Sequence, residues 1–181
     1  MRVFIAIRLP QPIIEALVAL QEPFRHNRRR GNLTSPRNLH LTLAFIGEAD
    51  GKLLDRIDAI LEDLAFEPFT LSLDKMGSFH RKDGAVWWAG LQKSPALIEL
   101  QRTLTDRLRE AEIPFDAKPF QPHITLVRQF SPAHDPMVLP TVTPQSFKVA
   151  SLALMRSHRV NDELTYSPLA IYLAEDNDDH V

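Results

Sequence analysis

Hydrophobic residues recur along the chain with two spacings, one typical of strands and the other of amphipathic helices. The apolar run from Val3 to Ile7 predicts a short buried strand that ends before Pro10. Apolar residues three or four positions apart predict three helices, over residues 13–25, 50–65 and 95–111. Asp50 can cap the second helix, and Ser94-Pro95 places a capping residue before a proline at the start of the third.

Alternating or continuous apolar stretches predict further strands, at residues 39–46, 70–79, 85–91, 122–127, 147–157 and 164–173. The second and third of these should form a hairpin, because Asp83-Gly84 between them is a typical turn signal. The basic segment 27–36 is expected to be a loop. The segment 131–145 contains four prolines and is expected to cross the molecule without regular structure.

The predicted elements repeat weakly in the two halves of the chain. A His-x-Thr triplet lies on the equivalent strand of each half, as His40-Leu41-Thr42 and His123-Ile124-Thr125. This repeat predicts an α+β fold of two similar antiparallel lobes, with a site along the pseudo-twofold groove between them. We expect residues 1–175 to form one bilobed domain and the acidic residues 176–181 to form a flexible tail.

Each triplet places two polar side chains on one face of an otherwise apolar strand. Residues two apart in a strand share a face, so His40 lies beside Thr42, and His123 lies beside Thr125. Such polar groups need partners, and a shared polar cleft would supply them. A neutral histidine that takes a proton and a protonated one that gives a proton are what phosphodiester cleavage requires. The near symmetry of the repeat leaves open which histidine has which role.

Further residues could complete a phosphate site. The two threonines and a cation can hold the non-bridging phosphate oxygens, and Arg128 is the expected cation because its planar guanidinium forks onto phosphate. Strict alternation would turn Arg128 away from His123, so this role requires the strand to end or bulge near Val127. Phe45, which closes the first motif strand, is the expected base-stacking residue. The run Arg28–Arg30 could hold a polyanion, although a solvated loop is the simpler interpretation.

Composition excludes several other classes of protein. With 181 residues and a net charge of −2, any affinity for phosphate must come from a local basic surface. The absence of cysteine excludes disulfides, thiol catalysis and cysteine-ligated zinc, and fits a reducing compartment. The sequence has no metal-binding histidine array, no Gly-x-Ser-x-Gly elbow, no signal-peptide core and no apolar stretch of membrane length. We therefore expect a cytoplasmic protein that uses neither a metal nor a cofactor.

The segments 38–48 and 120–128 resemble the two signature segments of the 2H phosphoesterase superfamily, and in particular the RNA 2′,3′-cyclic phosphodiesterase family, also called 2′-5′ RNA ligases or LigT-like proteins. Residues 2–10 and 164–169 are similar to that family as well. The resemblance implies a bilobed 2H fold with helices outside two antiparallel sheets. It also implies metal-independent hydrolysis of a 2′,3′-cyclic phosphate at an RNA end to a 2′-phosphomonoester. By the same analogy, His40 is the proton donor to the leaving 3′ oxygen and His123 is the proton acceptor.

Three alternatives stay open at this point. The chain could ligate RNA through 2′-5′ bonds, cleave small cyclic nucleotides or ADP-ribose 1″,2″-cyclic phosphate, or bind RNA ends without catalysis. Relatives often have a tryptophan shortly before the first motif, where this chain has residues 32–35 (Asn-Leu-Thr-Ser), so the base preference is open as well. The expected partner is an RNA with a 2′,3′-cyclic phosphate end or a related cyclic nucleotide. The protein is expected to be a monomer that does not associate with a membrane.

Overall fold

Two antiparallel sheets form the framework of the protein, for which the computed structural model describes residues 1–175. The four-stranded sheet has the order β3-β1-β8-β9 and consists of β1 (Arg2–Arg8), β3 (His40–Glu48), β8 (Ser151–Val160) and β9 (Glu163–Leu173). The five-stranded sheet has the order β2-β6-β5-β4-β7 and consists of β2 (Arg28–Leu33), β4 (Phe69–Arg81), β5 (Gly84–Leu91), β6 (His123–Pro132) and β7 (Ser146–Val149). The predicted α+β class with two antiparallel sheets is confirmed.

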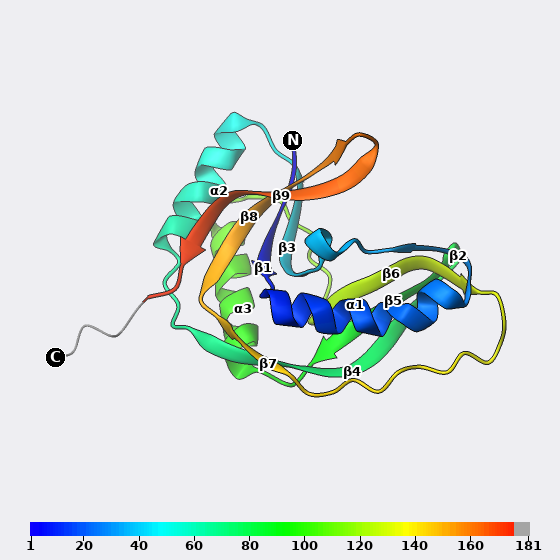
Figure 1. Ribbon diagram of the computed structural model, residues 1–181. Coiled ribbons are helices and arrows are strands. Elements are labelled where there is room, and N and C mark those ends of the chain that lie inside the picture. Colours follow the sequence, from blue (N-terminus) through cyan, green and yellow to red (C-terminus); the bar gives the residue numbers. More distant parts are fainter. Residues whose placement is uncertain (176–181) are drawn as a thin grey trace.

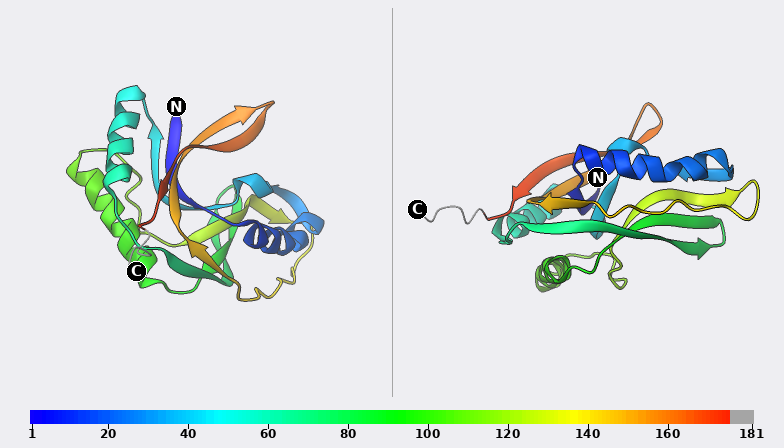
Figure 2. Two further views of the ribbon diagram at one scale, coloured as in Figure 1. Left: turned by 60° about the vertical axis from the view of Figure 1, so that its left-hand side comes forward. Right: turned by 60° about the horizontal axis from the view of Figure 1, so that its bottom comes forward.

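The helices within residues 1–175 are α1 (Gln11–His26), α2 (Gly51–Asp63) and α3 (Pro95–Glu110), with one 3-10 turn, η1 (Pro36–Asn38). Both predicted caps form, since the side chain of Asp50 accepts from the backbone of Leu53 at 2.8 Å, and that of Ser94 from Leu97 at 3.1 Å. Helix α1 lies along the five-stranded sheet and contacts β2 and β6, whereas α3 contacts α2 and β3 (Figures 1 and 2). None of these helices is long and apolar enough to cross a membrane.

The two lobes exchange their hairpins. Strand β3 carries the first motif and lies in the four-stranded sheet with the β8–β9 hairpin of the second half of the chain. Strand β6 carries the second motif and pairs with the β4–β5 hairpin of the first half. The predicted lobes therefore exist, but each lobe combines strands from both halves of the sequence.

Two predicted segments are wrong. The segment 27–36, expected to be a loop, contains β2, which pairs with β6. Its arginines are exposed on a sheet edge, so it lacks the apolar alternation from which a strand is predicted. The expected strand 147–157 is divided between β7, which pairs with β4, and β8, which pairs with β1 and β9. The apolar pattern runs on because both pieces are buried. Residues 133–145 have no helix or strand, as predicted, and the acidic tail 176–181 lies outside the described residues.

One continuous apolar cluster joins both sheets and all the helices. The alternate residues Leu39, Leu41 and Leu43 of the first motif strand belong to it and are at most 4% exposed. Burying each of these side chains contributes roughly 1.5–3 kcal/mol, so the register of β3 is strongly fixed. The same alternation turns His40 and Thr42 to the opposite face of β3, toward the other lobe.

Candidate active site

The two His-x-Thr motifs meet in one small cavity between the lobes. It has a volume of about 50 Å³, and it is the point where β3 of one sheet comes close to β6 of the other. The lining residues are Thr34, Asn38, His40, Thr42, His123, Thr125, Arg128 and Tyr166. The structure thus brings together both histidines, both threonines and the arginine that the sequence singled out.

The ring of His40 is held on both sides. Its Nδ1 lies 2.6 Å from the carbonyl oxygen of Asn38, and its Nε2 lies 2.8 Å from Oγ1 of Thr42. A carbonyl only accepts, so Nδ1 carries the hydrogen, and Nε2 of the neutral ring accepts from the threonine hydroxyl. The ring packs against Phe4 and Tyr166, with centroid distances of 4.9 and 5.2 Å.

His123 repeats half of this arrangement. Its Nδ1 lies 2.5 Å from the carbonyl oxygen of Gln121, two residues earlier, just as Asn38 is two residues before His40. The same argument puts the hydrogen on Nδ1. Its Nε2 has no hydrogen-bond partner among residues 1–175, and the ring packs against Phe79 at 5.3 Å and Trp88 at 6.1 Å. Each histidine is therefore fixed through Nδ1 between two aromatic rings, which leaves Nε2 for chemistry.

Burial favours the neutral form of both histidine rings. Burial lowers the pKa of His40 to about 4, against the opposing effect of its hydrogen bond to Asn38, and the nearby charges of Arg128 and His123 lower it further. Burial is also the main cause that lowers the pKa of His123, with contributions from Arg128 and Arg81. An anion in the cavity would act in the opposite sense, so a bound phosphate favours protonation of one ring.

A β-bulge turns Arg128 into the cavity. Along β5, Trp87 and Trp88 are neighbours, but their partners on β6 are Val127 and Thr125, so Leu126 is an extra residue in β6. Both Leu126 and Val127 are buried, which shifts the alternation by one position and brings Arg128 to the side of His123. The structure thus meets the condition that the sequence set for Arg128.

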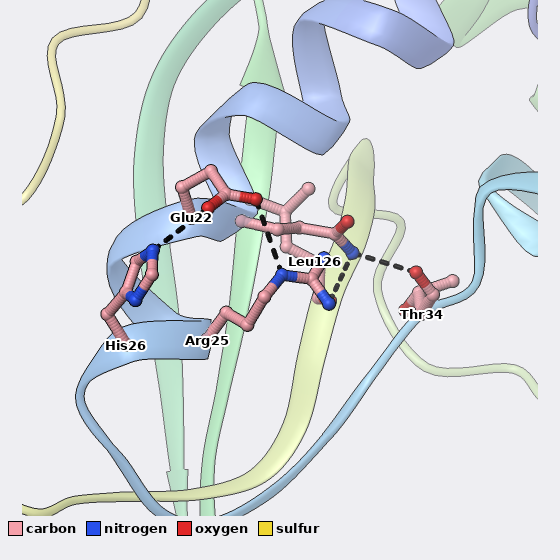
Figure 3. Close-up of polar contacts among 6 residues, drawn as sticks. Glu22, Arg25, His26, Thr34 and Leu126 are labelled. Carbon is pink, nitrogen blue, oxygen red and sulfur yellow. Dashed lines mark hydrogen bonds and ion pairs between the residues drawn. The ribbon is translucent and has the colours of Figure 1, made fainter.

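The bulge is supported from α1 by Gln21, a buried residue that the sequence analysis did not single out. Its side-chain Nε2 donates to the carbonyl oxygens of Leu126, at 2.9 Å, and Thr34, at 2.8 Å (Figure 3). One amide therefore joins the bulge to the chain segment that brings Thr34 to the cavity. The sequence gives only a weak signal for Gln21, because a glutamine on the apolar face of a predicted helix can have many roles.

Asn38 and Tyr166 also line the small cavity. The side chain of Asn38 is 4% exposed, donates to the carbonyl of Leu164 at 2.8 Å and accepts from the backbone of Tyr166 at 3.1 Å. These two bonds tie η1 to β9 and place Tyr166 against His40. The contact joins residues 128 positions apart, so no local pattern could indicate it.

Phe45 lies in a larger, more open cavity of about 640 Å³ that adjoins the small one and shares Thr42, His123 and Arg128 with it. Phe79, from the opposite sheet, lines the same cavity. The guanidinium of Arg2 lies 4.9 Å from the centroid of the Phe45 ring. Phe45 is therefore beside the histidine pair without touching the small cavity. Within residues 1–175, no group of three or more histidine, aspartate or glutamate side chains is placed to hold a metal ion.

Known proteins are similar to this chain over most of its length. Residues 9–161 match the 2'-5' RNA ligase superfamily. A protein of Escherichia coli (strain K12) named RNA 2',3'-cyclic phosphodiesterase is 31% identical over 169 residues, which cover 93% of both chains. A protein of Thermus thermophilus with the same name is 33% identical over 168 residues, which cover 87% of this chain and 82% of the relative.

Solved structures are similar to this one over nearly the whole chain. The crystal structure of E. coli LigT complexed with 3'-AMP is similar with a TM-score of 0.84 and 29% identity, over 97% of this chain and 98% of that one. A crystal structure of a protein from T. thermophilus is similar with a TM-score of 0.81 and 30% identity, over 96% and 97% of the two chains. These matches confirm the resemblance inferred from the motif segments. The chain belongs to the 2'-5' RNA ligase superfamily.

Proposed function

We propose that the protein hydrolyses 2′,3′-cyclic phosphate ends of RNA to 2′-phosphomonoesters, with His40 and His123 as the acid and base. The relatives named RNA 2',3'-cyclic phosphodiesterase support the reaction. The observation that carries the roles is the small cavity. In it, two histidines fixed through Nδ1 face two threonines and one arginine.

The reaction opens the cyclic phosphate at its 3′ side. His123 Nε2 takes a proton from water as the water oxygen bonds to phosphorus. The bond from phosphorus to the 3′ oxygen breaks, and that oxygen takes the proton of His40 Nε2, which leaves a 3′-hydroxyl and a 2′-phosphate. Arg128, Thr42 and Thr125 hold the non-bridging oxygens, where negative charge is concentrated. The two rings then exchange protons with solvent before the next turnover.

The low pKa of His40 sets a condition on these proton transfers. The ring must gain a proton before it can act as an acid, and the cyclic phosphate monoanion favours that step because it enters beside the ring. Protonation converts Nε2 from acceptor to donor, so the hydroxyl hydrogen of Thr42 becomes free for a phosphate oxygen. Substrate binding should therefore take up a proton.

The first test of this mechanism measures the activity of His40→Ala and His123→Ala on an oligonucleotide that ends in a 2′,3′-cyclic phosphate. Each variant should lose at least about a thousandfold in kcat/KM, while wild-type activity should persist in excess chelator. His26→Ala is the control, because His26 is exposed on α1 and lines neither cavity. Near-normal activity of either site variant in chelator would refute the two-histidine mechanism.

A substrate with sulfur in place of the 3′ oxygen separates the two roles. A thiolate leaves without a proton, so this substrate should restore much of the activity of His40→Ala and none of that of His123→Ala. The reverse pattern would exchange the roles. Phosphorus NMR of the product should show a 2′-phosphate, and a 3′-phosphate would mean that the other bond breaks.

Ligation is a second candidate, favoured by the superfamily to which the chain belongs. If a ribose 5′-hydroxyl takes the place of water, the same ring opening gives a 2′-5′ phosphodiester. His123 lines the larger cavity as well as the small one, so a second RNA end could approach it from there. The test incubates an RNA that ends in a cyclic phosphate with a 5′-hydroxyl RNA and then digests the product with an enzyme specific for 3′-5′ bonds. A joined product that resists digestion shows 2′-5′ ligation, whereas hydrolysis alone gives no joined product.

A cytoplasmic location and a monomeric state stay predictions from the sequence.

A further inference from the structure

A second groove of about 630 Å³ lies at the end of the five-stranded sheet, beside the β4–β5 turn. We call it the hairpin groove. Residues of the turn, of β2 and of the segment 133–145 line it. That segment leaves β6 and returns to β7 along the sheet (Figure 1). Its principal lining residues are Arg30, Arg81, Lys82, Trp87, Phe130 and Met137.

The hairpin groove is a local basic surface in a chain whose net charge is −2. Arg30, Arg81 and Lys82 are exposed, and none of them forms an ion pair with another residue of the range 1–175. Arg30 donates to the backbone carbonyl of Asp83 at 2.6 Å, a contact that orients the guanidinium without neutralising it. Two carboxylates are nearby. Asp135 lines the groove, and Asp83 accepts from Gln129 at the turn, so three cations outnumber them.

The groove is connected to the candidate active site. Arg81 and His80 line both the hairpin groove and the larger cavity that contains His123 and Arg128. A chain that leaves the histidine pair through that cavity would pass Arg81 and reach Arg30 and Lys82. Half-buried Trp87 and buried Phe130 also line the groove, so Trp87 is the aromatic residue with surface left for a base. Cations together with aromatic faces are the combination that binds the phosphates and bases of a single nucleic-acid strand.

We propose that the hairpin groove binds the RNA strand on the 5′ side of its cyclic end, with backbone phosphates on Arg30, Arg81 and Lys82 and a base against Trp87. This proposal rests on the proposed function, because it takes the cyclic end to lie between His40 and His123. It specifies the substrate class, which is an oligonucleotide and not a mononucleotide. It also gives a role to Arg30, one of the exposed arginines of β2.

The test measures kcat/KM for adenosine 2′,3′-cyclic phosphate and for oligoadenylates of increasing length with the same end. Wild-type kcat/KM should rise with length until the groove is filled. The double variant Arg30→Ala/Lys82→Ala should lose about tenfold on the longer substrates, and its salt dependence should weaken by a slope of about 1.4, or about 0.7 per lost phosphate contact. Its kcat/KM for the mononucleotide should not change, because these two residues line only the hairpin groove.

The matched control is Lys93→Ala/Lys148→Ala, which removes the same charge from exposed positions that line neither the site nor the groove. It should behave as wild type on every substrate. No gain with length in the wild type would overturn the proposal, and so would an equal loss on short and long substrates in the Arg30→Ala/Lys82→Ala variant.

Binding of an octanucleotide with an ordinary 3′-phosphate, followed by fluorescence anisotropy, separates this proposal from the proposed function. Weaker binding by the double variant supports the groove even if no cyclic phosphate is hydrolysed. Unchanged binding overturns the groove even if the mononucleotide is hydrolysed normally.

Discussion

Replacing Gln21 with methionine should destabilise the protein more than its small change in side-chain volume suggests. The side chain is 1% exposed, and its Nε2 donates to the carbonyls of Thr34, at 2.8 Å, and Leu126, at 2.9 Å (Figure 3). Methionine fills similar space but has no donor. The carbonyl of Leu126 keeps one partner, since the backbone N–H of Thr34 also donates to it at 2.9 Å. The carbonyl of Thr34 loses the donor it has in the structure.

One lost hydrogen bond and one unsatisfied acceptor together amount to about 2–4 kcal/mol of unfolding free energy. Urea unfolding followed by circular dichroism measures this loss as a lower midpoint at constant slope. The folded fraction should also have a lower kcat/KM, because Arg128 follows the bulge that Gln21 supports.

The neighbouring residue supplies the control. Glu22 forms exposed ion pairs with Arg25, at 3.3 Å, and His26, at 3.1 Å, also drawn in Figure 3. Glu22→Gln should cost about 0.5 kcal/mol or less, since exposed pairs contribute little. If Gln21→Met cost no more than this control, strand pairing alone would hold the bulge. If it lost stability but kept full kcat/KM, Arg128 would be positioned independently of Gln21.

Three further changes test other parts of the site. The pKa of His40 is about 4 in the folded protein and about 6.5 in the unfolded chain, so the unfolded chain binds more protons between these values, and stability should rise with pH across this window. His40→Gln should remove about 3 kcal/mol of that rise, and an equal pH dependence in variant and wild type would contradict the buried neutral ring. Arg128→Gln should raise the pKa of both histidines in an NMR titration, because the guanidinium charge lowers both, and unchanged titration curves would place Arg128 elsewhere. Gly77→Ala should cost about 1–3 kcal/mol and disturb Trp88, because a Cβ there would lie 2.2 Å from the indole ring. Gly51→Ala, where a Cβ meets nothing within 4 Å, is the control and should not destabilise the protein.

The central part of the site was predictable because it depends on local rules. Strand alternation gives the shared face of His40 and Thr42, and buried leucines on the other face keep β3 in register. The second motif follows the same rule. The helices were predictable for a similar reason, since a capping residue and an apolar stripe lie within a few positions of each other in the sequence.

The remaining site residues depend on contacts between distant segments. Tyr166 reaches His40 only because Asn38 binds β9, and β9 joins the four-stranded sheet only through the exchanged hairpins. The bulge at Leu126 has no distinct residue type and arises from the pairing of β6 with β5. The arginine-rich strand β2 was missed because exposed polar residues on a sheet edge give no periodic apolar signal.

The two histidines come from equivalent strands, but their surroundings differ in a way that supports different roles. His40 lines only the small cavity, its Nε2 is bonded to Thr42, and its ring is packed between Phe4 and Tyr166. His123 lines both cavities, and its Nε2 has no partner among residues 1–175. An incoming water or hydroxyl must arrive from the open side, whereas the leaving oxygen is part of the bound substrate and needs no access path.

The base should therefore be the histidine that faces the open cavity, and the acid should be the enclosed one. On this geometry, and independently of the family analogy, we expect His123 to be the proton acceptor and His40 the proton donor. The same geometry predicts that a change in the open cavity affects water and a 5′-hydroxyl differently as nucleophiles. A bulky substitution at Phe79, which lines the open cavity beside His123, should slow the attack of a 5′-hydroxyl more than that of water, because the hydroxyl brings a second RNA end into that space and water does not. The ratio of ligation to hydrolysis in Phe79→Trp measures this directly, and an unchanged ratio would mean that the nucleophile enters from elsewhere.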